Sequence, residues 1–127
     1  QSKKKYYESL QVLYNKYLTQ GIGDELEVLS AEIATGGEGE SQVGRLTTIS
    51  NAYKDFGKGI MKIEVPTTLS QYHLNIANSA NNTGVSILGM AKVINDPIVG
   101  LSGLSQYQKY SEDLVKAVAD LESALSV

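Results

Sequence analysis

The chain contains only two prolines, Pro66 and Pro97, and each stands where a helix can begin. Proline is favoured in the first turn of a helix because its missing N–H would have no intrahelical partner there. Asp96, directly before Pro97, is a residue type that caps helices well. About thirty residues with a helical pattern lie between Val65-Pro66 and Asp96-Pro97, and about thirty more follow. Two such segments joined by an abrupt turn predict an antiparallel helical hairpin.

Apolar residues recur every three or four positions in the rest of the chain too, which is the period of an amphipathic helix. Gly21 and Gly23 interrupt the first segment, yet its apolar series keeps helical phase across them. This favours a kinked, nearly collinear rod, with a true turn between two helices as the alternative. The expected buried positions are Tyr6, Leu10, Leu13, Tyr14, Tyr17, Leu18, Ile22, Leu26, Leu29 and Ile33, then Val43, Leu46, Ile49, Tyr53, Phe56, Ile60 and Ile63, then Leu69, Tyr72, Ile76, Ala80, Thr83, Ile87, Ala91 and Ile94, and finally Leu101, Leu104, Tyr107, Ser111, Leu114, Val118, Leu121 and Leu125.

These patterns predict an all-α fold. Three glycines within residues 36–40 predict a loop, because glycine is costly in a helix interior. No alternation of apolar and polar residues of useful length occurs, so strands are not expected. The expected architecture is an up-down antiparallel bundle of four rods, the first of them kinked or split near Gly21 and Gly23. Residues 1–127 are expected to form a single bundle domain.

Seven of the twelve glycines fall inside the predicted helices, each at a cost of about 1 kcal/mol relative to alanine. One interpretation is that they allow helices to approach closely, for example along Ala77, Ala80 and Gly84 or at Gly100 and Gly103. The other is that these flat strips contact a second subunit or a partner. The seven are Gly44, Gly57, Gly59, Gly84, Gly89, Gly100 and Gly103.

The charge of the chain argues against nucleic acid as a partner. The net charge is −3, and without Lys3, Lys4 and Lys5 the remaining residues 6–127 carry 8 basic and 14 acidic groups, a net −6. A body of this sign repels phosphate backbones, and Arg45 is the single arginine for bidentate phosphate contacts. The absence of cysteine excludes disulfides and thiolate-bound metals.

His73 is the only histidine, and Ile76 and Ala77, one turn further along the helix, are not metal ligands. We expect its ring to bond a group on an adjacent helix rather than to hold a metal or act as a base. No phosphate loop, nucleophile elbow or paired Glu-x-x-His motif occurs. No catalytic, cofactor-binding or metal-binding residue is therefore predicted, no cofactor is expected, and the chain is not expected to be an enzyme.

The acidic residues Asp24, Glu25 and Glu27 are explained by the start of a helix, where negative charge is favoured. Eight tyrosines, by contrast, offer area for contacts at low entropic cost, at an interface or at the rim of a bundle core. The candidate ligand or contact residues of the chain are His73, Tyr72, Tyr107 and Tyr110.

From residue 60 onward the order of short motifs resembles that of uncharacterised helical proteins of ultra-small candidate-phylum bacteria. The motifs are Ile63-Glu64-Val65-Pro66, His73-Leu74, Asn78, Asp96-Pro97, and Tyr107 with Tyr110, and the resemblance is strongest over residues 63–110. It implies an extracytoplasmic helical domain behind an N-terminal membrane anchor. Lys3, Lys4 and Lys5 would then follow a removed anchor; a solvated helix start explains them equally well.

These observations lead to one expected function and two alternatives. The first is a non-enzymatic extracytoplasmic helical bundle that acts through protein contact at the cell surface or in an envelope assembly. The second is a ligand-binding sensor-type bundle with a pocket near His73. The third is a self-assembling filament or surface-layer subunit. The partner considered is another protein or a second copy of the chain, not nucleic acid, and contact with a membrane is expected only through an absent N-terminal anchor.

Overall fold

The computed structural model describes residues 3–34, 40–93 and 95–126, without the side chains of residues 40–43. Five α-helices make up nearly all of this part of the chain: α1 (Lys3–Leu18), α2 (Glu25–Ala34), α3 (Glu40–Ile60), α4 (Ser70–Met90) and α5 (Pro97–Leu125). The described residues contain no strand, which confirms the all-α fold class. None of the described helices is long and apolar enough to cross a membrane.

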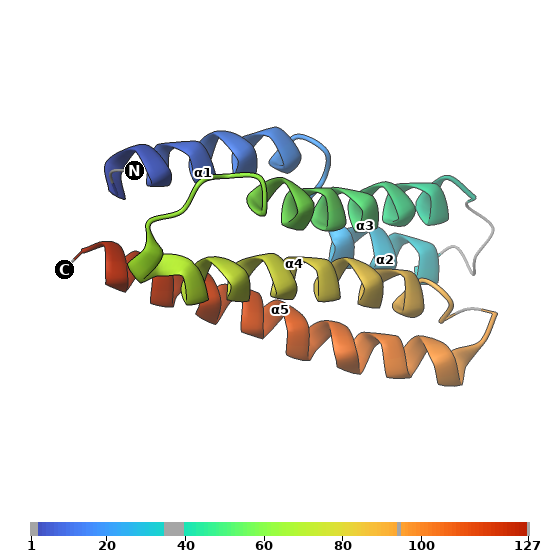
Figure 1. Ribbon diagram of the computed structural model, residues 1–127. Coiled ribbons are helices and arrows are strands. Elements are labelled where there is room, and N and C mark those ends of the chain that lie inside the picture. Colours follow the sequence, from blue (N-terminus) through green and yellow to red (C-terminus); the bar gives the residue numbers. More distant parts are fainter. Residues whose placement is uncertain (1–2, 35–39, 94, 127) are drawn as a thin grey trace.

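Three helices, α3, α4 and α5, lie side by side and reverse direction at each turn (Figure 1). The most extensive helix contacts are those of α4 with α5 and with α3. The two shorter helices, α1 and α2, both pack against α3. The predicted loop at residues 36–40 falls almost wholly outside the described residues.

The two proline-marked helix starts have different outcomes. Asp96 caps α5 as predicted, with its Oδ1 accepting a hydrogen bond from the N–H of Val99 at 3.3 Å, and Pro97 is the first helical residue. Pro66 instead precedes a single 3₁₀ turn, Thr67–Leu69, and α4 begins only at Ser70. At its other end α4 stops at Met90, so it is shorter than the spacing of the prolines predicts.

The first segment is split into two helices by a turn, one of the two predicted alternatives, and the chain does not reverse there, because α1 and α2 run in the same direction (Figure 1). Residues 19–24 form a turn in which Gly21 and Gly23 adopt φ angles of 104° and 99°. These left-handed conformations cost little for glycine alone, and they break the helix. The helical phase read across the glycines therefore does not continue into α2.

This break changes which face of α2 is buried. Leu26 and Ile33, expected in the core, are 49% and 50% exposed. Leu29 is buried as predicted, and the other buried residues are Glu25, Val28 and Glu32, which share its helical spacing. The turn thus rotates two glutamates into the interior in place of two apolar side chains.

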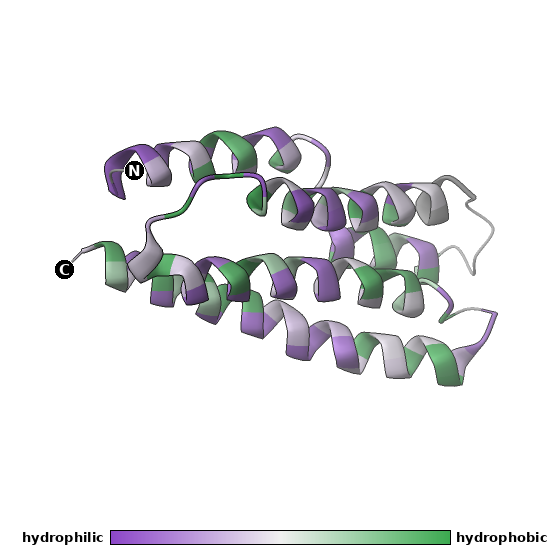
Figure 2. Ribbon diagram, viewed as in Figure 1, coloured by the Kyte–Doolittle hydropathy of each residue, from purple (hydrophilic) through white to green (hydrophobic). Residues whose placement is uncertain are grey.

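On α4 and α5, too, a buried residue in places lies one position away from the predicted one. His73 is buried and its neighbour Tyr72 lies at the surface. Gly100 and Gly103 are buried, whereas Leu101 is 61% exposed. The first turn of α5 is hydrophobic (Figure 2), yet its side chains Ile98 and Leu101 stand outside the core, at 82% and 61% exposure.

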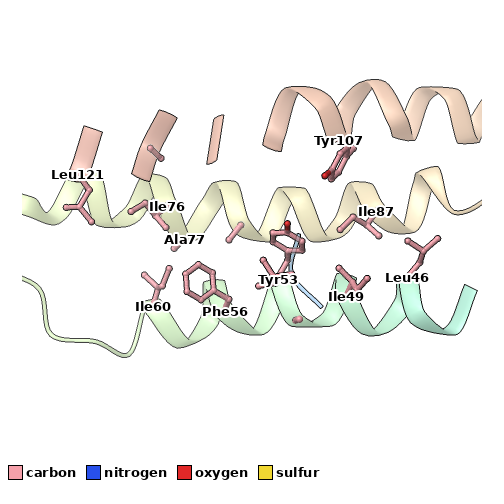
Figure 3. Packing of buried hydrophobic residues seen from close by; sticks show 14 of the residues in the cluster. Leu46, Ile49, Tyr53, Phe56, Ile60, Ile76, Ala77, Ile87, Tyr107 and Leu121 are labelled. Atoms are coloured by element: carbon pink, nitrogen blue, oxygen red, sulfur yellow. The ribbon is translucent and has the colours of Figure 1, made fainter. Parts of the chain in front are cut away.

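The predicted stripe of α3 is confirmed where it is described. Its side chains face α4 and α5 across the core (Figure 3). The edges of two tyrosine rings from α1, Tyr14 and Tyr17, meet the ring of Phe56 at centroid distances of 5.9 and 6.4 Å. The buried residues of this stripe are Leu46, Ile49, Tyr53, Phe56 and Ile60; the side chains of Val43 and of Ile94 on the next stripe lie outside the described part.

Glycines set the distances between the three central helices. A Cβ atom added to Gly103 would lie 2.3 Å from the backbone nitrogen of Met90, and one added to Gly100 would lie 2.2 Å from the Cα of Val93. Between α3 and α4, a Cβ on Gly84 would lie 2.7 Å from the carbonyl oxygen of Ser50. These glycines are therefore explained by close helix approach within the chain.

We predict that Gly103→Ala lowers the free energy of unfolding by about 2–3 kcal/mol, because α4 and α5 must separate to admit the methyl group. Gly44→Ala is the matched control: Gly44 lies in α3 with no atom within 4 Å of an added Cβ. That substitution should raise stability by about 0.5–1 kcal/mol through helix propensity. Urea unfolding measures both, and a Gly103→Ala protein as stable as the wild type would contradict the close approach.

Candidate functional site

The most concentrated polar chemistry in the described interior surrounds the carboxylate of Glu25, which is 3% exposed. Its Oε2 accepts hydrogen bonds from the hydroxyl groups of Tyr53 on α3, at 2.8 Å, and Tyr107 on α5, at 2.5 Å. Its Oε1 accepts one from the backbone N–H of Gly23 at 2.9 Å. Figure 3 shows Tyr53 and Tyr107 reaching into the core from their two helices. We call Glu25, Tyr53 and Tyr107 the Glu25 cluster.

The local sequence explains why a carboxylate is tolerated at this point. Glu25 is the first residue of α2, where the partial positive charge of the helix N-terminus favours an anion. The φ angle of 99° at Gly23 belongs to the turn that brings its N–H to the same side chain. A buried charge is costly unless it is hydrogen-bonded, and these three donors offset that cost.

The two tyrosines of the Glu25 cluster act as donors. Burial, together with the neighbouring Glu25 carboxylate, raises the pKa of both Tyr53 and Tyr107 well above the usual value. Both hydroxyls therefore stay protonated at any physiological pH and cannot serve as bases. The arrangement is suited to tying α2, α3 and α5 together in one register.

A second polar contact joins α1 to α4. The hydroxyl of Tyr6 lies 2.7 Å from Nδ1 of His73, and both side chains are buried. Burial raises the pKa of Tyr6 to about 12 and lowers that of His73, while a hydrogen bond to the backbone of Ile60 opposes the second effect. A neutral histidine beside a protonated tyrosine accepts at Nδ1, which leaves the proton on Nε2. We call this contact the Tyr6–His73 pair.

The four residues singled out from the sequence do not form one site. His73 belongs to the Tyr6–His73 pair and Tyr107 to the Glu25 cluster. Tyr72 is 36% exposed, and Tyr110 is half-buried with the Nζ of Lys109 at 5.2 Å from its ring centroid. The geometry thus gives two of the four an internal structural contact and leaves two near the surface.

Sequence reasoning missed Glu25 and its partner Tyr53 as functional groups, and it missed Tyr6 as the partner of the histidine. The sequence explains Glu25 only by the start of a helix, and Glu25 does start α2. The signal that could have found it is the spacing of Glu25, Val28, Leu29 and Glu32, which defines a buried face once the glycines are allowed to break the phase. The burial of Glu32 also raises its pKa.

Two open hollows mark the surface of α1. The first, of about 380 Å³, lies between the start of α1 and the end of α5 and is lined by Lys3, Lys4, Tyr7, Glu122, Leu125 and Ser126. The second, of about 480 Å³, lies between α1 and the segment after α3 and is lined by Lys5, Glu8, Ser9, Val12, Leu13, Lys16 and Ile63. Neither is lined by His73. Within the described residues no group of three or more His, Asp or Glu side chains is placed to hold a metal ion.

Comparison of the chain with models of protein families, with curated proteins and with solved structures found no match.

We predict that Glu25→Gln lowers the free energy of unfolding by about 2–3 kcal/mol, because a buried donor loses its acceptor. Whichever way the amide is turned, its nitrogen faces another donor, either the tyrosine hydroxyls or the N–H of Gly23. Glu27→Gln, on the exposed side of the same helical turn, is the control and should change stability by less than about 0.5 kcal/mol. Equal effects of the two substitutions in urea unfolding would show that the Glu25 cluster contributes nothing.

The lowered pKa of His73 predicts that stability falls as the medium becomes acidic. In the unfolded chain the ring takes up its proton near pH 6.5, and in the folded chain only at lower pH. The contribution of the neutral His73 ring to stability is therefore present above pH 6.5 and is lost as the pH falls below it. Because His73 is the only histidine, unfolding curves between about pH 7 and 5.5 should show a slope of up to about 1.4 kcal/mol per pH unit. His73→Gln should flatten this slope; an unchanged slope would assign it to other groups.

Proposed function

We propose that the chain is a non-enzymatic helical domain that acts through protein contact, and that α1 carries its contact surface. The observation behind this proposal is the second hollow, in which Val12, Leu13 and Ile63 form an apolar floor between Lys5 and Lys16. Val12 is 72% exposed, and Met61, close in sequence to Ile63, is 56% exposed. Apolar side chains rimmed by charge are typical of protein interaction sites.

The charge of α1 supports the same proposal. The helix carries Lys3, Lys4, Lys5 and Lys16 against Glu8, a net +3, while residues 19–127 carry a net −6. A surface of opposite sign to the rest of the molecule favours the approach of acidic partners and disfavours basic ones.

The sensor-type alternative has less support. A sensor pocket near His73 would need ring nitrogens directed at a ligand, but Nδ1 faces Tyr6 and the ring also bonds the backbone of Ile60. The hydroxyl of Tyr107 is likewise directed at Glu25. These groups serve packing, so we place the function on the outer surface instead.

The proposal includes a four-rod, up-down arrangement in which α1 and α2 together take the place of the first rod. Support comes from α1 and α2 packing against successive parts of α3: the rings of Tyr14 and Tyr17 meet Phe56, and Glu25 meets Tyr53. Both short helices run in the direction opposite to α3 in Figure 1.

The proposed place of action is the cell surface or an envelope assembly, with the domain held by an N-terminal anchor. The support for this location is the resemblance over residues 63–110 and the run of three lysines at the start of α1. It fits a domain that contacts other proteins through an outward-facing helix.

The absence of cysteine provides a direct test, because Val12→Cys creates a unique thiol at the centre of the second hollow. A membrane-impermeant maleimide with a photoreactive group, added to intact cells, should label it and form a discrete protein adduct on illumination. Val85→Cys is the control, on the exposed side of α4 at 53% exposure; it should be labelled without forming that adduct. Failure to label either thiol would refute the location, and equal adducts at both positions would refute a contact surface on α1.

A further inference from the structure

We propose that the second hollow on α1 binds the outer face of α5 in another copy of this chain, so that copies join head to tail. This inference rests on the proposed function, in which α1 carries the contact surface, and it names the partner. The α1 face of the contact is Lys5, Val12 and Lys16; the α5 face is Glu112, Val115 and Glu122.

On the α1 face, an exposed valine stands between two lysines. Lys5 comes seven residues before Val12 and Lys16 four residues after it, so the three side chains lie along one side of the helix. All three are exposed and line the same hollow. Ser9, three residues before Val12, adds a small side chain beside it.

On the α5 face, an exposed valine stands between two glutamates. Val115 is 70% exposed, with Glu112 three residues before it and Glu122 seven residues after it, again along one side of the helix. Ala119, four residues after Val115, is the small neighbour. Lys116 does not reverse the charge of this face, because its Nζ binds Oδ2 of Asp120 at 2.8 Å.

The spacing of these charges matches if the two helices pack antiparallel with Val12 against Val115. At 1.5 Å per residue, Lys16 then lies about 6 Å along the axis from Val12, and Glu112 lies about 4.5 Å in the same direction from Val115. In the other direction Lys5 lies about 10.5 Å along the axis from Val12, and Glu122 lies about 10.5 Å from Val115. Each lysine thus meets a glutamate.

The one acidic group in the hollow does not oppose this alignment. Glu8 falls opposite Ala119 rather than opposite a carboxylate, since each lies four residues from its valine. The small side chains of Ser9 and Ala119 leave room for close approach of the two helices.

A second copy fits this hollow because the same molecule carries the complementary face elsewhere. Glu122 lines the first hollow together with Lys3, Lys4 and Tyr7, whereas Val12 lines the second hollow. The α1 face and the α5 face therefore belong to different hollows of the chain. Two different surfaces that bind each other between copies form a heterologous contact, which extends into a chain of subunits unless it closes into a ring.

Sedimentation velocity tests the proposal with four proteins: the wild type, Val12→Glu, Val115→Lys and the control Val85→Lys. The wild type should associate as its concentration rises to about 1 mM, and less so when salt rises from about 0.05 to about 0.5 M, because the ion pairs are screened. Val12→Glu and Val115→Lys should each weaken association at least tenfold, while Val85→Lys should leave it unchanged. Circular dichroism confirms that all four remain helical.

Mixing distinguishes a head-to-tail contact from a symmetric one. The Val12→Glu protein keeps an intact α5 face and the Val115→Lys protein keeps an intact α1 face, so an equal mixture should associate although neither protein does so alone. A wild type that stays monomeric, a Val115→Lys protein that associates normally, or a mixture that stays monomeric would each overturn the proposal.

The thiol at position 12 separates failure of this inference from failure of the proposed function. An adduct with twice the mass of the chain supports the proposal. An adduct with a different protein, together with a monomeric wild type, overturns the self-contact and leaves a contact surface on α1 standing. If the thiol forms no adduct with any protein, both the self-contact and the contact surface on α1 are refuted.

Discussion

Backbone-to-backbone approach at glycine is the constraint on which the rest of this structure depends. Gly103 lets α5 lie almost directly on the end of α4, Gly100 lets it lie against Val93 just after α4, and Gly84 allows the same close approach between α4 and α3. Because close packing gains dispersion energy over a large contact, these glycines offset their own helix-breaking cost. The three long helices therefore form a tight slab at these glycines.

The two short helices attach to this slab by different means. Directional polar bonds fix them at two points: the Tyr6–His73 pair for α1, and the Glu25 cluster for α2. Such bonds contribute less net stability than apolar burial, but they specify one register because a buried donor without its acceptor is costly. Two of the four candidate residues from the sequence, His73 and Tyr107, are thus used in internal contacts, which supports the proposal of a contact surface on the outside of the chain.

The fold class, the glycine packing and the buried stripe of α3 could be predicted from the sequence because each follows from local spacing. The buried face of α2 could not, since two left-handed glycines reset the helical phase and no periodicity crosses such a turn. The burial of His73 in place of the predicted Tyr72 has a similar cause. The two residues are adjacent on the helix, and only the contact with Tyr6, which is distant in sequence, decides which side chain turns inward. The Glu25 cluster joins three helices, so no local pattern contains it.

The unequal attachment of the helices also has a mechanical consequence. A partner that pulls on α1 pulls against the Tyr6–His73 bond, the edge contacts of two rings with Phe56, and the packing of Leu10 and Leu13 on the core. A partner that pulls on α5 pulls against the most extensive helix contact of the described chain, with α4, which begins with glycine-packed backbones at Gly100 and Gly103. Under tension the chain would yield first at its N-terminal helix, and the slab of α3, α4 and α5 would remain folded after α1 had been drawn away.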